Sequence, residues 1–152
     1  MRLTLLKSSC DPNPDADKEE HFFTYSVYSH EGTWKEAKTA NEAYKLNTPL
    51  YAKVEEAHDG ELEDCLSLVN VNKENIIIEV IKKAEDSDHL VVRMYEFHNK
   101  RTKATLEFFK DIEEIRECNL IERDLEELKA QGNKVDFEIK PFEIKTFKFK
   151  LK

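Results

Sequence analysis

The side chains best suited to bind a metal lie near the start of the chain. Asp15, Asp17 and His21 place two carboxylates and an imidazole within a short stretch. Their spacing matches neither a zinc motif nor the ligand order of an EF-hand loop. Aspartate is also a common turn residue, so an acidic turn that leads into a strand explains the same three positions. We therefore predict no metal site in this chain.

Groups that could act in acid–base or nucleophilic catalysis are present, but no motif arranges them. Ser9 or Cys10 would need His21 or His30 held beside it as a base. Glycoside hydrolysis needs two opposed carboxylates. The acidic residues instead occur as adjacent pairs: Glu19-Glu20, Glu55-Glu56 and Glu126-Glu127. The sequence therefore predicts no catalytic residue and no cofactor-binding residue.

Aromatic rings on a surface can bind sugars, and Trp34, Tyr44 and Tyr51 are the candidates for such a platform. Packing in a core is the commoner use of large aromatic side chains. Arg93 lies in a strand-like Arg-x-Tyr-Glu setting, where it could contact a substrate or form a structural ion pair. We assign it to neither role.

Composition limits the partners of the chain. The formal net charge is −8, whereas a protein that binds nucleic acid through phosphates needs a basic surface. No stretch approaches the ~20 apolar residues of a membrane span. Cys10, Cys65 and Cys118 form no C-x-x-C pair, and free thiols indicate a reducing compartment. We therefore predict a cytoplasmic protein without nucleic-acid or membrane partners.

Alternation of apolar and polar residues predicts strands in the first third of the chain, at residues 2–5, 21–28 and 50–54. The first of these strands contains Leu3 and Leu5, so the chain opens directly with a pattern typical of a core strand. We therefore expect a piece of a larger protein whose neighbouring strands lie upstream. The apolar groups left without neighbours would favour a homo-oligomer formed through this region.

A helix is predicted at residues 33–44. Thr33 and Glu36 have the spacing of a capping box at its start, and Asn47-Thr48-Pro49 closes it.

The rest of the chain is predicted to be β structure. Strands are expected at residues 65–70, 76–82, 90–96, 104–109 and 135–139. Residues 110–118 have helical propensity but only a weak apolar stripe, so their state is left open. Near the end, the rings of Phe142 and Phe147 are both expected in the core. The two residues have opposite parities, which predicts a bulge near Lys145-Thr146. Short strands at such intervals are typical of an antiparallel β-sandwich.

Several stretches together resemble the C-terminal end of the α-mannosidases of glycoside hydrolase family 38. They run in the family's order along most of the chain: Leu3–Ser8, Asp11–Asp17, His21–Tyr25, Tyr28–His30, Ala43–Leu50, Ile76–Asp86, Leu90–Glu96, Asn119–Arg123 and Lys140–Phe147. Two positions depart from the family pattern, with Ser29 where proline is frequent and Glu19 where glycine is frequent.

The resemblance implies a mainly β fold with one short helix. Residues 1–60 would form the end of a galactose-mutarotase-like supersandwich, and residues 61–152 the terminal β-sandwich. It also implies that the zinc and the catalytic groups lie in a catalytic domain of the same polypeptide that is absent from this chain. The function expected is a non-catalytic β-region that supports an α-mannosidase. The alternative is a free-standing carbohydrate-binding or oligomerisation module.

Overall fold

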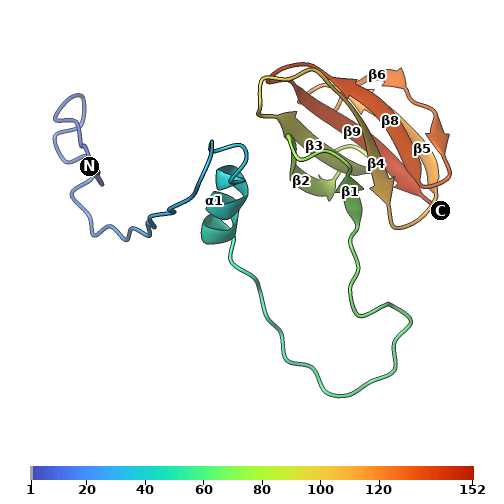
Figure 1. Ribbon diagram of the computed structural model, residues 1–152, viewed down its shortest axis with the longest axis horizontal. Coiled ribbons are helices and arrows are strands. Elements are labelled where there is room, and N and C mark those ends of the chain that lie inside the picture. The colour runs from blue at the N-terminus through green and yellow to red at the C-terminus, as the bar shows by residue number, and fades with distance from the viewer. Residues whose placement is uncertain (1) are drawn as a thin grey trace. The chain divides into compact units, whose positions relative to one another are not determined.

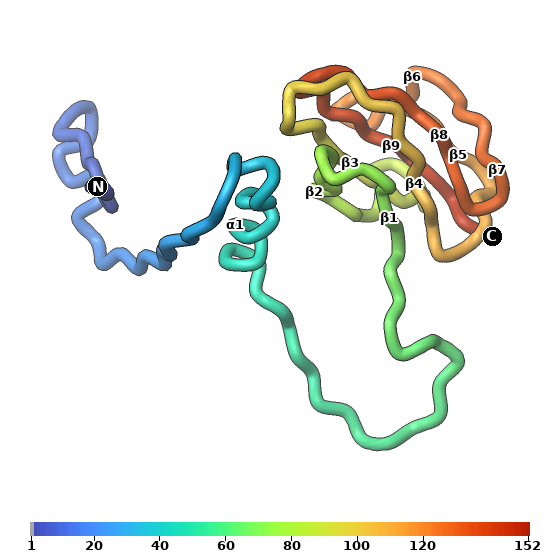
Figure 2. The backbone as a smooth tube through the Cα atoms, in the orientation of Figure 1, coloured from blue at the N-terminus to red at the C-terminus, as the bar shows by residue number. Residues whose placement is uncertain are grey.

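The computed structural model describes residues 2–152. They form two compact units, which divide between Ala52 and Lys53. Figures 1 and 2 show the short helix α1 in the first unit. All strands of the described residues belong to the second unit.

The second unit is a sandwich of two sheets (Figure 1). The four-stranded sheet has the order β1-β4-β8-β7 and the five-stranded sheet the order β2-β3-β9-β5-β6, with antiparallel pairing throughout. The strands are β1 (Val69–Val71), β2 (Ile76–Lys83), β3 (Leu90–Glu96), β4 (Thr102–Phe108), β5 (Ile112–Cys118), β6 (Asp124–Glu127), β7 (Ala130–Gln131), β8 (Lys134–Ile139) and β9 (Ile144–Leu151). The predicted antiparallel sandwich is confirmed.

The core lies between the two sheets, because successive side chains of a strand point to opposite faces. Buried and more exposed residues alternate along β4 and β8. Aromatic rings join the layers: Phe108 packs against Phe149 at 4.5 Å between ring centroids, and Phe137 against Phe147 at 5.3 Å. Full burial of each such ring contributes about 1.5–3 kcal/mol. These contacts fix how the two sheets face each other.

A bulge explains why residues 110–118 gave no clear signal in the sequence. They form β5, and the register of β5 against β9 shifts between Ile112 and Glu114. The extra residue lets Ile112 and Ile115 both enter the core, although they are three positions apart. That spacing is typical of a helix, which accounts for the ambiguity.

Two other strand predictions need correction. The strand predicted at 65–70 is reduced to β1, because β4 ends at Phe108, the partner of Val69, and leaves residues 65–67 without a neighbour. The bulge predicted at Lys145-Thr146 is wrong, since β9 pairs with β3 without interruption over this stretch. Phe142 lies in the turn before β9, so its different parity has no bearing on the strand.

The first unit contains the predicted capping box, but the helix begins later. The Thr33 N–H donates to Glu36 Oε2 at 2.7 Å, and the Glu36 N–H donates to Thr33 Oγ1 at 3.4 Å. These bonds start a turn that ends at Lys38. The helix α1 then runs over Thr39–Asn47 and closes before Pro49, as predicted.

A left-handed residue separates the turn from the helix. Lys38 has φ +53°, its N–H donates to the Lys35 carbonyl at 3.2 Å, and the Thr39 N–H donates to the Trp34 carbonyl at 3.0 Å. This pair of bonds is the Schellman motif that normally ends a helix. The prediction of one helix over 33–44 is therefore wrong, because the motif divides it.

The strands predicted at 2–5, 21–28 and 50–54 are also wrong. These segments have no regular secondary structure, and their side chains are exposed, with Phe22 at 87% and Leu50 at 100%. Alternation gives a segment an apolar face, but a strand also needs a backbone partner for its N–H and C=O groups. Within residues 2–152 no strand pairs with these segments.

Candidate functional site

The residues considered for a metal site have other partners. The Asp15 carboxylate accepts a bond from Lys18 Nζ at 2.6 Å, and His21 Nε2 lies 3.0 Å from the Asp17 carbonyl oxygen. Across the part of the chain that the structure describes, no three His, Cys, Asp or Glu side chains are grouped to hold an ion. The geometry thus gives these residues local structural contacts.

The possible nucleophiles and bases also make local contacts. Ser9 Oγ bonds to the backbone of Asp11, and His30 Nδ1 lies 3.1 Å from the Glu31 carbonyl oxygen. Cys10 is exposed. None of these contacts joins a nucleophile to a base.

The aromatic candidates and the acidic pairs are spread over the chain. Trp34 is half exposed with Lys35 Nζ 5.4 Å from its ring centroid, and Tyr51 lies in a segment without regular structure. Glu126 and Glu127 are consecutive residues of β6, so their carboxylates point to opposite sides of the strand. Such a pair cannot flank one glycosidic bond.

Arg93 binds neutral acceptors on the outer face of the five-stranded sheet. Its Nε donates to Thr146 Oγ1 at 3.0 Å, and its Nη2 donates to the Leu120 carbonyl at 2.9 Å. Thr146 lies opposite Arg93 in the register of β3 and β9. Arg93 therefore fastens the loop 119–123 to the sheet through hydrogen bonds, which differ from the ion pair considered from the sequence.

The same loop is held at a second point by Glu122. Its carboxylate binds Lys82 Nζ at 2.9 Å and accepts the Glu85 N–H at 2.8 Å. The hydrogen bond from Lys82 holds the pKa of Glu122 below its usual range, with the Glu85 N–H as the next cause. Glu122 has φ +64°, and these bonds hold it in that left-handed conformation.

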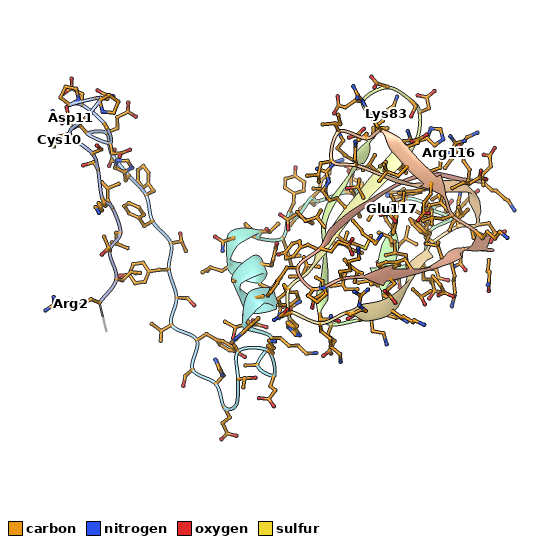
Figure 3. The ribbon with its side chains drawn as sticks, turned by 90° about the horizontal axis from the view of Figure 1, so that it is seen from above. Arg2, Cys10, Asp11, Lys83, Arg116 and Glu117 are labelled. Atoms are coloured by element: carbon orange, nitrogen blue, oxygen red, sulfur yellow. The ribbon has the colours of Figure 1, made fainter. Side chains whose placement is uncertain are left out.

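Ion pairs continue along both faces of β5. Arg116 Nη1 binds Asp124 Oδ2 at 3.0 Å, and the Glu117 carboxylate binds Lys145 Nζ at 2.6 Å. Arg116 and Glu117 follow one another in β5 and are labelled on the sandwich in Figure 3. As neighbours in a strand they point to opposite faces, so each pair ties β5 to the adjacent strands on its own face.

A buried carboxylate organises one end of the sandwich. Glu96 is 1% exposed and accepts bonds from Asn75 Nδ2 (2.9 Å), the His98 N–H (2.7 Å) and the Phe142 N–H (3.0 Å). Burial by itself raises the pKa of Glu96, but the hydrogen bonds outweigh it and hold the pKa below its usual value. Asn75 also donates to Thr102 Oγ1 at 2.7 Å. Sequence reasoning missed this cluster, because its members are far apart along the chain.

The outer face of the four-stranded sheet carries a polar hollow of about 420 Å³. Thr105 Oγ1 donates to Asp136 Oδ1 at 2.6 Å within it, and the Thr105 N–H donates to Asn72 Oδ1 at 2.9 Å. Its lining consists of Asn70, Val71, Asn72, Thr105, Glu107, Lys129, Gln131, Lys134 and Asp136. Amide, hydroxyl and carboxylate groups of this kind can bind sugar hydroxyls, although the lining contains no aromatic ring.

The geometry defines a class of protein: a two-sheet antiparallel β-sandwich whose buried polar side chains hold its surface loops. In residues 2–152, no helix has the length and apolar character needed to cross a membrane.

Comparison with known proteins identifies the family. Residues 75–147 match the glycosyl hydrolases family 38 C-terminal beta sandwich domain. The chain is 36% identical to α-mannosidase G of Dictyostelium discoideum and 31% identical to α-mannosidase 2C1 of Mus musculus, over 97% and 96% of its length. It spans 14% of the length of each relative. Residues 75–147, which hold most of the sandwich, therefore belong to the glycoside hydrolase family 38 C-terminal β-sandwich domains, and the resemblance found in the sequence is confirmed.

Proposed function

We propose that the chain is the C-terminal β-region of an α-mannosidase and that it supports the catalytic portion of the enzyme. The observation that carries this proposal is that almost the whole chain aligns with a small part of much longer α-mannosidases. The polar clusters at Glu96 and Glu122 support the proposal, because each of them holds a loop in place. Neither cluster joins a nucleophile, an acid and a metal ligand.

The proposal extends to the two parts of the chain. Residues 1–60 would be the end of the large β-supersandwich of the parent enzyme, and residues 61–152 its terminal sandwich. The exposed apolar side chains of Phe22 and Leu50 support this division, since neighbouring strands in the parent would cover them. Zinc and the catalytic acid and nucleophile would be supplied by the catalytic domain, and the parent enzyme would act in the cytoplasm.

A chimeric enzyme tests the proposal. In α-mannosidase G, the segment aligned with this chain would be replaced by this chain, and hydrolysis of an aryl α-mannoside would be measured. We expect an active enzyme, whereas deletion of the segment should yield an inactive or insoluble protein. An inactive, unfolded chimera would show that this chain cannot serve as that region.

Carbohydrate binding is a second candidate function, favoured by the polar hollow on the four-stranded sheet. Titration of the isolated chain with mannose and mannobiose, followed by NMR, tests it. Binding should shift the amide signals of Asn72 and Thr105 and should be lost in Asp136→Ala. Unchanged spectra at millimolar sugar would exclude this role for the hollow.

A further inference from the structure

Phe142 is an exposed apolar side chain on a strained backbone. It lies in the turn between β8 and β9 with φ +55°, a conformation that disfavours bulky residues, and its side chain is 65% exposed. The N–H of this residue donates to the buried carboxylate of Glu96. The protein therefore fixes a large apolar ring in solvent, although an exposed ring adds nothing to the core.

Two further apolar side chains lie at the same end of the five-stranded sheet. Ile144 begins β9 on the outer face and pairs with Tyr95 of β3. Leu120 is held over that face by Arg93, which lies two residues before Tyr95 and binds the Leu120 carbonyl. Both Ile144 and Leu120 are more than half exposed. Leu120, Phe142 and Ile144 are called the end patch below.

Both loops that carry the end patch are held by carboxylates. Glu96 fixes the turn of Phe142, and Glu122, itself at φ +64°, fixes the loop of Leu120 through Lys82. Left-handed conformations of residues other than glycine persist when surrounding bonds over-determine them, and they concentrate at functional sites. Rigid presentation of apolar groups lowers the entropy lost when a partner binds.

We propose that the end patch is a docking surface for the part of the α-mannosidase polypeptide that lies outside this chain. The inference rests on the proposed function and names the surface by which the sandwich would join the rest of the enzyme. The relatives are about seven times as long as the matched segment, so most of their chain is available as this partner. Association would bury the three apolar side chains, which is favourable in water.

Two substitutions separate docking from folding. Phe142→Asn removes the ring, and asparagine adopts the left-handed conformation more readily than phenylalanine. Ile144→Thr keeps a β-branched side chain suited to a strand while removing apolar surface. The control is Leu68→Asn, because Leu68 precedes β1 at the opposite end of the sandwich, next to the end of β4, and is 51% exposed.

The three variants would be made in the isolated chain and in the α-mannosidase G chimera. None of the three isolated chains should melt at a lower temperature than the parent chain. In the chimera, Phe142→Asn and Ile144→Thr should each shorten the half-life of activity at elevated temperature by about tenfold, the rate change for about 1.4 kcal/mol. Leu68→Asn should leave the half-life unchanged.

The outcomes distinguish the two proposals. A parent chimera without activity overturns the proposed function and this inference with it. An active chimera whose half-life is unaffected by both end-patch variants overturns the docking surface alone. Sedimentation of the isolated chain tests a second copy as the occupant: a dimer that Phe142→Asn dissociates would also overturn the assignment to the rest of the enzyme.

Discussion

At the scale of single residues, two phenylalanines of the same apolar stretch differ in burial. Phe142 and Phe147 both belong to the closing apolar run and were both expected in the core. Phe147 is fully buried and packs on Phe137, whereas Phe142 is exposed in a turn. The expected core role of Phe142 is wrong, because its left-handed backbone turns it away from the strand.

Alanine substitutions should show this difference directly. Phe147→Ala should lower the free energy of unfolding by roughly 3–5 kcal/mol, as expected for a fully buried phenylalanine. Phe142→Ala should change it by less than about 0.5 kcal/mol, as for a surface position. Urea denaturation, followed by far-UV circular dichroism, measures the unfolding free energies of both variants. Equal shifts of the two midpoints would contradict the burial seen in the structure.

Glu96 should make stability depend on acid pH. Its pKa is lowered in the folded state, so its ionised form favours folding. The contribution is fully present above about pH 4.3, where a free glutamate titrates, and is lost as the pH falls through the folded-state pKa. Glu96→Gln should cost roughly 1.5–3 kcal/mol at neutral pH. The difference from the parent chain should shrink below about pH 4.3; a difference that stays constant down to pH 2 would count against this reading.

At the scale of elements, the left-handed Lys38 decides where α1 begins. Lys38→Gly should stabilise the first unit by up to about 1 kcal/mol, because glycine adopts positive φ without a steric penalty. Lys45→Gly, inside α1, should destabilise the helix by about 1 kcal/mol and is the matched control. Amide hydrogen exchange of residues 39–47 measures both effects. Exchange should slow in Lys38→Gly and quicken in Lys45→Gly. If exchange slowed in neither variant, or slowed in Lys45→Gly, the geometry at Lys38 would be contradicted.

The elements that could be predicted from the sequence are those whose partners lie within the chain. β2 and β3 were predicted nearly to the residue, since each has an apolar pattern and a neighbour to pair with. The segment 21–28 has an equally good pattern but no paired neighbour, and alternation alone could not reveal that. Positive φ at Lys38 and Phe142 was also hidden, because neither residue type signals it.

The candidate site was less predictable for a related reason. Arg93 was singled out, but its acceptors, Thr146 and the Leu120 carbonyl, are 53 and 27 residues away. The carboxylate of Glu96 gave no signal, because a buried, fully hydrogen-bonded glutamate looks like any surface glutamate in a sequence. Long-range partners of this kind become visible only when the strand register is known.

At the scale of the whole molecule, the chain should behave as an accessory region. We predict that the isolated chain retains no stoichiometric zinc after dialysis and hydrolyses no aryl α-mannoside. The physical reason is that the described residues bring together no three side chains able to hold a metal ion, and the adjacent glutamates of β6 point to opposite sides of their strand. Atomic absorption and a chromogenic assay check this. Bound zinc together with chelator-sensitive activity would contradict it.

The three cysteines differ in accessibility, so their rates of chemical modification can report local opening of the structure. Cys10 and Cys65 are exposed, while Cys118 is buried with its Sγ 3.6 Å from the Thr146 carbonyl oxygen. Burial raises the pKa of the Cys118 thiol, and the thiolate is the reactive form. A thiol reagent should therefore modify Cys10 and Cys65 at once, and Cys118 only as fast as the structure that covers it opens. The slow phase would measure the rate of that opening without an engineered label.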